Sequence, residues 1–208
     1  MEKIQKFNMK NIPLLLDVVA PMWSPPVGDD EFKRFAVEYI IRNNIFENDY
    51  RFELVENLNV ADSESRTDSE NQDVLAAAFF ARKGDVNKAG EWFKANSGRF
   101  PKDFLIAPDL SRAYIEEMDS RTFGFMNDDD IKLSLFISRK KGCGSLIIDR
   151  LSEKLRDEGW KNLYLWTDCE CNWEWYEKHG YSLVEENVYE AFSSENQDYK
   201  TYIFKKKI

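Results

Sequence analysis

A strand–turn–helix–strand pattern in the last third of the chain most constrains how it can fold. Apolar and polar side chains alternate over residues 131–137, which predicts a strand. After a glycine-containing turn, Ile147, Leu151 and Leu155 share one face of a predicted helix. The apolar run at 163–166 then predicts a strand that is covered on both faces. Two strands joined by one helix are parallel and connected by a right-handed crossover, so the sequence predicts an α/β fold.

Weaker patterns place the other elements on both sides of a helical insertion. Helical spacing predicts helices at 14–22, 30–43, 86–96, 108–118 and 172–179. Apolar runs predict strands at 4–7, 51–56, 74–81, 181–191 and 199–206. Residues 62–73 contain no large apolar side chain and are predicted to form a loop. We expect a single domain of three parts: N-terminal strands and helices (1–84), a helical insertion between two strands (85–129) and a C-terminal core (130–208).

Charge and cysteine content narrow the class of protein. With 29 Lys and Arg against 38 Asp and Glu, the 208 residues carry a formal net charge of −9. Nucleic acids and anionic membrane surfaces require basic fields, so we expect neither as a partner. The three cysteines do not suit a disulfide framework, and no apolar run is long enough to span a membrane. We therefore expect a cytoplasmic protein.

The turn from Ser138 to Ser145 (SRKKGCGS) is the most informative short segment. Its two glycines permit backbone angles at which successive N–H groups converge on one point. The helix that follows adds unpaired N–H donors and the positive end of its dipole, and three neighbouring cations add charge. Such a turn can bind a phosphate group, although an ordinary strand-to-helix turn with exposed lysines explains the same residues.

Spacing excludes two well-known glycine-loop families. A dinucleotide-binding turn needs a third small residue where Ile147 stands, and the nucleoside-triphosphate loop needs a lysine that is missing before Ser145. The pattern Arg-x-x-Gly-x-Gly does fit, with Arg139 as its first residue. Downstream, the residues from Trp175 to Tyr181 (WYEKHGY) match an aromatic-Tyr-Glu-Lys-x-Gly-aromatic signature. In this order, around a strand–helix–strand unit, the two motifs resemble the GCN5-related N-acetyltransferase superfamily.

The resemblance implies a fold, a cofactor site and a catalytic residue. The fold would be the mixed α/β sheet of that superfamily, with acetyl-coenzyme A as co-substrate and without a metal. Tyr176 would lie near the coenzyme sulfur and act in catalysis, as a proton donor to the leaving thiolate. The coenzyme would lie along the strand backbone at Leu135, Phe136 and Ile137. The pyrophosphate would bind the turn, which Arg139 shapes, through the backbone amides of Lys141, Gly142, Cys143, Gly144 and Ser145.

The implied activity is transfer of an acetyl group to a primary amine of a small molecule or peptide. A non-catalytic acyl-coenzyme A-binding or interaction module would need the same turn, so the sequence leaves this alternative open. The insertion would cover the acceptor side or form a homodimer contact.

Other candidate residues have more than one interpretation. A general base is not evident, although Asp128, Asp129 and Asp130 precede the coenzyme-lining strand and equally fit a solvated loop. Thr167 and Asp168 end the second parallel strand, where they could face a ligand or cap the next helix. His179 is interpreted as a structural residue that caps the end of a helix, not as a general base. A zinc site would need His179 to converge with the three cysteines, Cys143, Cys169 and Cys171, whose spacing does not favour one.

Overall fold

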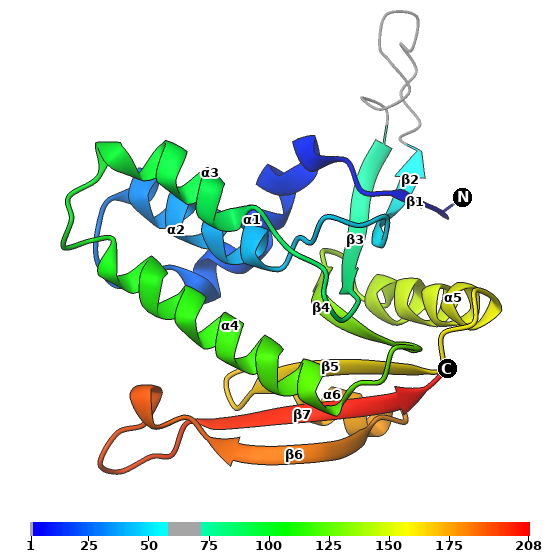
Figure 1. The fold of residues 1–208 in the computed structure, drawn as a ribbon. Coiled ribbons are helices and arrows are strands. Elements are labelled where there is room, and N and C mark those ends of the chain that lie inside the picture. The colour runs from blue at the N-terminus through cyan, green and yellow to red at the C-terminus, as the bar shows by residue number, and fades with distance from the viewer. Residues whose placement is uncertain (1, 58–71) are drawn as a thin grey trace, which may run out of the picture.

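The structure is a computed structural model that describes residues 2–57 and 72–208 (Figure 1). Its seven strands form one sheet in the order β1-β2-β3-β4-β5-β7-β6. The strands are β1 (Glu2–Lys6), β2 (Arg51–Asn57), β3 (Gln72–Ala81), β4 (Asp130–Ser138), β5 (Asn162–Asp168), β6 (Ser182–Val188) and β7 (Lys200–Lys207). The helices are α1 (Ile12–Trp23), α2 (Asp30–Asn43), α3 (Ala89–Asn96), α4 (Ile106–Phe125), α5 (Cys143–Asp157) and α6 (Glu174–Lys178).

The parallel pair of strands predicted from the sequence is present and only partly formed. β4 and β5 are parallel, and the other neighbouring strands of the sheet are antiparallel. The pairing of β4 with β5 covers Asp130–Lys132 against Asn162–Tyr164 and then stops. β4 stays paired with β3 as far as Ser138, and β5 stays paired with β7 as far as Asp168. The sheet therefore opens between its two central strands. In Figure 1, β3 stands nearly upright while β5 and β7 run across the view.

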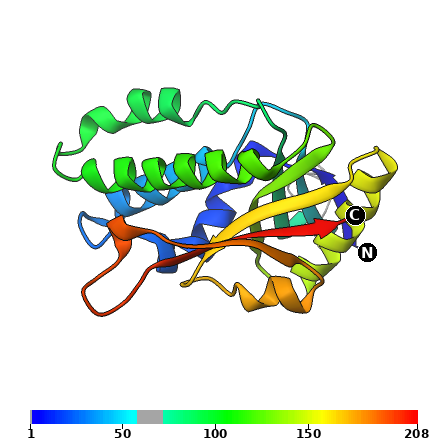
Figure 2. The same ribbon diagram turned by 60° about the horizontal axis from the view of Figure 1, so that its bottom comes forward.

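Helices cover both faces of the sheet. On one face, α5 buries Ile147, Leu151 and Leu155 against residues of β2 to β5 and β7, as the helical spacing predicted. On the other face, α1 packs against β3 and β4, and α4 packs against β5 and β7. Figure 2 shows α3 and α4 beside α2, and both contact it. Aromatic rings of α2 and α3 pack with Phe100 and Phe104, which precede α4 in the chain. The helices of the predicted insertion thus build one wall of the molecule.

A β-bulge in β4 changes the simple alternation that the sequence predicted for 131–137. Phe79 pairs with Leu135 and Phe80 with Leu133, so Ser134 is an extra residue in β4. As a result, the side chains before and after Ser134 point to opposite faces. Leu133 packs in the core beneath α5, whereas Leu135 packs in the core beneath α1. The prediction of an uninterrupted period of two was wrong, because a single inserted residue reverses every following side chain.

Several element boundaries differ from the predictions for local reasons. α3 begins at Ala89 instead of 86, because the Val86 carbonyl accepts a hydrogen bond from Glu47 N and Asn87 pairs with Phe46. α4 continues to Phe125, beyond the predicted end at 118, since Thr122 is buried. α6 is shorter than predicted, and β6 ends at Val188, followed by a 3-10 turn, Glu190–Phe192. Of the loop predicted at 62–73, residues 62–71 lie outside the described residues.

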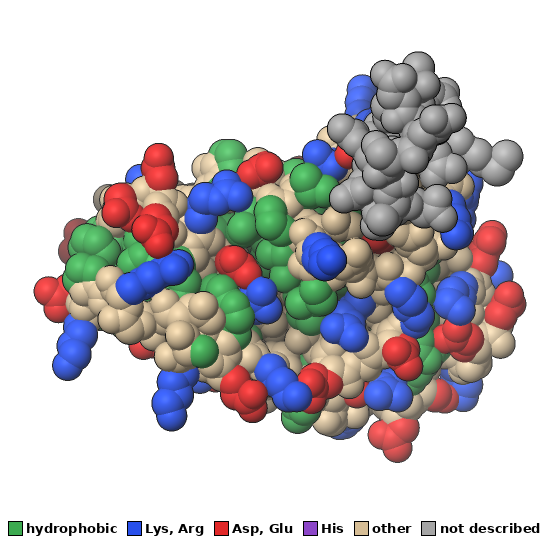
Figure 3. All heavy atoms as spheres, turned by 90° about the horizontal axis from the view of Figure 1, so that it is seen from above, with side chains coloured by type: hydrophobic (Ala, Val, Ile, Leu, Met, Phe, Trp, Pro, Cys, Tyr) green, Lys and Arg blue, Asp and Glu red, His purple; other side chains and the backbone are tan. Residues whose placement is uncertain are grey.

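The surface mixes both signs of charge. On the face seen in Figure 3, basic and acidic side chains are interspersed, and hydrophobic side chains reach the surface between them. In the ranges that the structure describes, no helix is long and apolar enough to cross a membrane.

Candidate active site at the opening between β4 and β5

The turn that follows β4 is tied to the neighbouring strand through Arg139. The Arg139 amide donates to the Leu75 carbonyl oxygen at 2.8 Å. Its guanidinium group donates to Asp73 Oδ1 at 2.7 Å and to the Val74 carbonyl oxygen at 2.5 Å. The Arg139 charge is therefore directed toward β3, which fits a role in shaping the turn.

Four of the five predicted amides of this turn are free of protein partners. The Cys143 amide donates to the Lys140 carbonyl oxygen at 3.1 Å, and the Cys143 side chain is buried. Within the described ranges, no hydrogen bond is made by the amides of Lys141, Gly142, Gly144 and Ser145. Gly142 precedes α5 with φ +84°, a left-handed conformation that favours glycine. Free amides at the positive end of a 15-residue helix fit an anionic group.

Gly144 lets α5 approach β4 closely. A Cβ atom at this position would lie 2.7 Å from Phe136 Cζ and 3.2 Å from Ser138 Cβ. The Phe136 ring packs in turn against Trp175, with 5.9 Å between ring centroids. The turn, the strand and α6 therefore meet around one aromatic ring.

Beyond Lys132, the backbone of β4 faces the opening, whereas most of its side chains are packed on the two faces of the sheet. Leu135 and Ile137 are buried against α1, and Phe136 packs on the opposite face. Within the described sheet, no strand pairs with β4 on the β5 side beyond Lys132. The sequence did not single out Ser134, whose buried Oγ has no hydrogen-bond partner among the described residues. Its place in a bulge depends on the register with β3, which local pattern does not encode.

Tyr176 lies on α6, on the same face of the sheet as α5. Its ring is half-buried against Trp175, Tyr181 and Phe204, at centroid distances of 5.3, 5.4 and 5.8 Å. Its hydroxyl makes no hydrogen bond to any described residue. Burial raises the pKa of Tyr176, and the nearby Cys171 and Asp168 raise it further. The phenol therefore stays protonated at neutral pH and can donate.

Asp168 ends β5 and is a buried carboxylate with neutral partners. It is 8% exposed, accepts a hydrogen bond from the Tyr114 hydroxyl at 3.2 Å and another from the Glu170 amide at 3.1 Å. The second bond is the capping role that the sequence allowed; Tyr114, from the insertion, was not anticipated. Burial is the largest cause that raises the pKa of Tyr114 and of Tyr199, and the negative charge of Asp168 is the second largest. Burial of the Cys171 thiol, although the residue as a whole is exposed, and then the Asp168 charge raise the pKa of this thiol to about 12.

The other candidate acids and the histidine have structural contacts. Asp130 is buried and accepts hydrogen bonds from Asn127 N at 2.9 Å and from Asn162 Nδ2 at 2.5 Å. Asp129 forms an ion pair with Lys161, which lowers the pKa of Asp129. His179 stacks on Trp175 at 3.7 Å between centroids, and its Nδ1 lies 2.7 Å from the Trp175 carbonyl oxygen.

The cysteines were the only other candidate metal ligands. Cys143 is buried, Cys169 is half-buried and Cys171 is exposed, and all three are free thiols. In the part of the chain that the structure describes, no three His, Cys, Asp or Glu side chains are grouped to hold a metal ion.

A buried ion pair that the sequence did not suggest lies where β4 and β5 separate. Lys132, the last β4 residue paired with β5, is fully buried and forms an ion pair with Asp119 of α4. Asp119 Oδ1 also accepts a hydrogen bond from Trp166 Nε1 of β5 at 2.6 Å. Burial lowers the pKa of Lys132, and the Asp119 charge opposes this shift. One carboxylate thus links both strands at the start of the opening.

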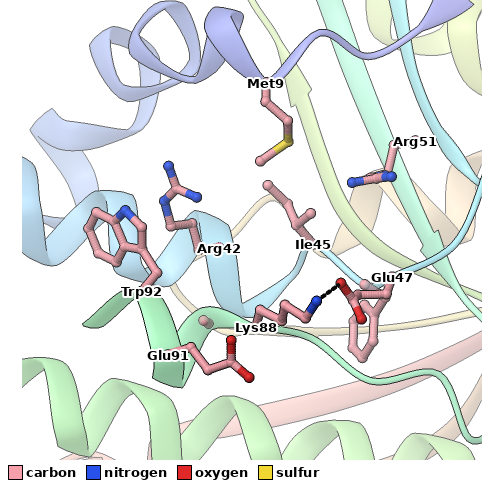
Figure 4. Close-up of a pocket in the computed structure, with 10 residues that line it drawn as sticks. Met9, Arg42, Ile45, Glu47, Arg51, Lys88, Glu91 and Trp92 are labelled. Atoms are coloured by element: carbon pink, nitrogen blue, oxygen red, sulfur yellow. Dashed lines mark ion pairs between the residues drawn. The ribbon is translucent and has the colours of Figure 1, made fainter. Parts of the chain in front are cut away.

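A separate cavity of about 320 Å³ lies near α2, β2 and α3 (Figure 4). It is lined in part by Arg42, Lys88 and Trp92. Lys88 pairs with Glu47 at 2.7 Å, and Arg42 lies over the Trp92 ring at 4.5 Å from its centroid. None of the predicted site residues lines it, and two of its three cations, Arg42 and Lys88, are already engaged. The opening between β4 and β5 therefore remains the candidate site.

Known structures share this architecture. No family model and no curated protein sequence matches the chain. Among solved structures, the ribosomal-protein-S18-alanine N-acetyltransferase from Escherichia coli matches with a TM-score of 0.52 and 11% identity, over 100% of this chain and 94% of that chain. The C-terminal condensation domain of Ebony, in complex with beta-alanyl-dopamine, matches with a TM-score of 0.51 and 8% identity, over 100% of this chain and 99% of that domain. The chain therefore has the fold of the GCN5-related N-acetyltransferases, as its two motifs indicated.

Proposed function

We propose that this chain is an N-acetyltransferase that transfers an acetyl group from acetyl-coenzyme A to a primary amine. One observation supports it most: the sheet loses its pairing between β4 and β5, and the opening is flanked by the free amides of the turn and by Tyr176. The solved structures with this fold include an N-acetyltransferase whose described acceptor is an alanine of a ribosomal protein.

The residues present fit coenzyme A in three ways. The amides of Lys141, Gly142, Gly144 and Ser145 suit the pyrophosphate, and Gly144 keeps the turn close to β4. The unpaired edge of β4 suits a chain of amides such as pantetheine. Preorganised strand N–H groups also stabilise the negative charge that develops on a thioester carbonyl oxygen.

The reaction can be written with its protons in balance. The amine nitrogen bonds to the thioester carbonyl carbon, and the carbon–sulfur bond breaks with its electron pair leaving on sulfur. An ammonium acceptor loses two protons in forming the amide, of which one ends on the thiol and one goes to solvent. Tyr176 donates a proton to the leaving sulfur, whose thiol pKa is about 8.5, and regains one from the amine through water.

Two measurements test the proposal. Acetyl-coenzyme A at about 100 times its dissociation constant should stabilise the folded protein by about 2.7 kcal/mol, observed as a rise in melting temperature. A panel of amines with acetyl-coenzyme A should then release free thiol. Binding without turnover of any amine would favour the non-catalytic acyl-coenzyme A-binding module. Absence of acetyl-coenzyme A binding would overturn both the N-acetyltransferase and the non-catalytic binding module.

A further inference from the structure

Asp168 is a buried carboxylate without a cationic partner. No Lys, Arg or His of the described ranges forms an ion pair with it, whereas the buried Asp119 is paired with Lys132. Its hydrogen-bond donors, the Tyr114 hydroxyl and the Glu170 amide, are neutral. The Tyr199 hydroxyl and the Cys171 thiol, which also interact with Asp168, are neutral as well. A buried charge normally has an opposite charge beside it, because removal from water is costly. The missing cation therefore points to a ligand.

An aromatic cluster packs around Tyr114, which donates a hydrogen bond to this carboxylate. The aromatic cluster consists of Tyr114, Trp166, Tyr189, Phe192 and Tyr199. The Tyr114 ring lies 5.4, 4.7, 5.1 and 6.1 Å from the other four ring centroids in that order. Aromatic faces attract cations and also bury apolar groups. Phe192 is 37% exposed, so the aromatic cluster reaches the surface.

The two sides of the opening are chemically different. Along β5, Leu165 faces the α5 side, and Trp166 faces the α4 side. Asp168 follows Trp166 by two residues and contacts Tyr114 of α4, so it lies on the α4 side. Tyr176 and the free amides of the turn lie on the α5 side. Three backbone hydrogen bonds connect the two sides: Cys171 N donates to the Asp168 carbonyl oxygen at 3.2 Å, Trp173 N to the Cys171 carbonyl oxygen at 2.9 Å, and Tyr176 N to the Trp173 carbonyl oxygen at 3.1 Å.

From these contacts we infer that Asp168 and the aromatic cluster form the acceptor site, and that it takes a primary ammonium group attached to an aromatic or other apolar body. The carboxylate holds the ammonium, and the rings hold the body. The amine would approach from the side opposite to the turn. As an assignment of the acceptor, this inference rests on the proposed function, but the binding of such an amine can be measured without catalysis.

Calorimetric titration of the full chain with 2-phenylethylamine tests the inference. Titrations would be done with and without saturating coenzyme A, and 2-phenylethanol would serve as the neutral probe of the same shape. We expect the amine to bind and the alcohol to bind at least about tenfold more weakly, because a charged hydrogen bond contributes that much. Asp168→Asn should weaken amine binding by a similar factor and leave the affinity for acetyl-coenzyme A unchanged.

Two variants serve as controls. Asp198→Asn removes an exposed carboxylate that precedes Tyr199, and it should leave amine affinity unchanged. Tyr114→Phe removes a neutral donor but retains the Asp168 charge, so amine binding should persist within a few-fold. Preference for the alcohol, equal amine affinity in Asp168→Asn, or no amine binding to the wild-type chain would each overturn the inference. Acetyl-coenzyme A binding, measured separately, would then still decide the proposed function.

Discussion

The two ends of the β4–β5 pair differ in how their polar groups are satisfied. At the paired end, Asp130 accepts three hydrogen bonds and Lys132 is neutralised by Asp119. At the open end, Asp168 has no counter-ion among the described residues, and the Tyr176 hydroxyl has no partner there. Both ends are buried in one sheet, so burial alone does not explain the difference. Polar groups that are fully paired within the chain hold the sheet together, whereas a carboxylate without a counter-ion and a phenol without a hydrogen-bond partner among the described residues could interact with a ligand.

The largest effect is expected at the paired end. Lys132→Met would leave Asp119 buried and unpaired, and should lower the free energy of unfolding by about 3–5 kcal/mol. Urea denaturation measures this loss in the free energy of unfolding. The matched control is Lys161→Met, which breaks the ion pair with Asp129 where Lys161 is 68% exposed; it should cost less than about 1 kcal/mol. Equal losses would show that the Lys132 pair is not a structural anchor.

At the open end, Tyr176→Phe should affect catalysis and not stability. Removal of the proton donor should lower kcat by about 100-fold with unchanged acetyl-coenzyme A affinity. Tyr181→Phe is the control. The Tyr181 side chain packs in the same hydrophobic core beneath α5 as Tyr176, its buried hydroxyl has no hydrogen-bond partner among the described residues, and it has no assigned role. Steady-state kinetics of both variants separates them, and a normal kcat in Tyr176→Phe would remove that phenol from the mechanism.

The free amides of the turn can be tested through Gly142. Gly142→Ala and Gly142→Glu both place a side chain at φ +84° and share the same backbone strain. Only the glutamate adds negative charge beside an anion site. Acetyl-coenzyme A should therefore bind Gly142→Glu about tenfold more weakly than Gly142→Ala, a difference of about 1.4 kcal/mol. Equal affinities, measured by calorimetry, would argue against phosphate binding at this turn.

The smallest effect concerns Cys171 at the open end. Its pKa is raised to about 12, so the thiolate fraction is very small at pH 7 and grows about tenfold with each pH unit up to that value. Alkylation by iodoacetamide, followed by mass spectrometry of the Cys171 peptide, should follow this rise without a plateau below pH 10. A plateau that begins at about pH 9 to 10 would mean that neither burial nor the Asp168 charge raises the pKa of this thiol.

Local sequence was sufficient for much of the fold. The crossover unit and the glycine turn with its positive φ at Gly142 both follow from residues close together in the chain. The Asp119–Lys132 pair and the bulge at Ser134 do not, because each is created by contact with an element far away in sequence. For the same reason, the sequence placed Asp168 at a strand end but could not reveal that, among the described residues, no Lys, Arg or His side chain forms an ion pair with it.

The bulge at Ser134 makes β4 unusually sensitive to chain length. Before Ser134 the strand is anchored beneath α5, and after it beneath α1. Deletion of this one residue would rotate everything downstream by half a turn, and would exchange the inward- and outward-pointing positions up to the glycine turn. A substitution along this strand changes one side chain, whereas loss or gain of a single residue would change the register of β4 and the position of the glycine turn that follows it.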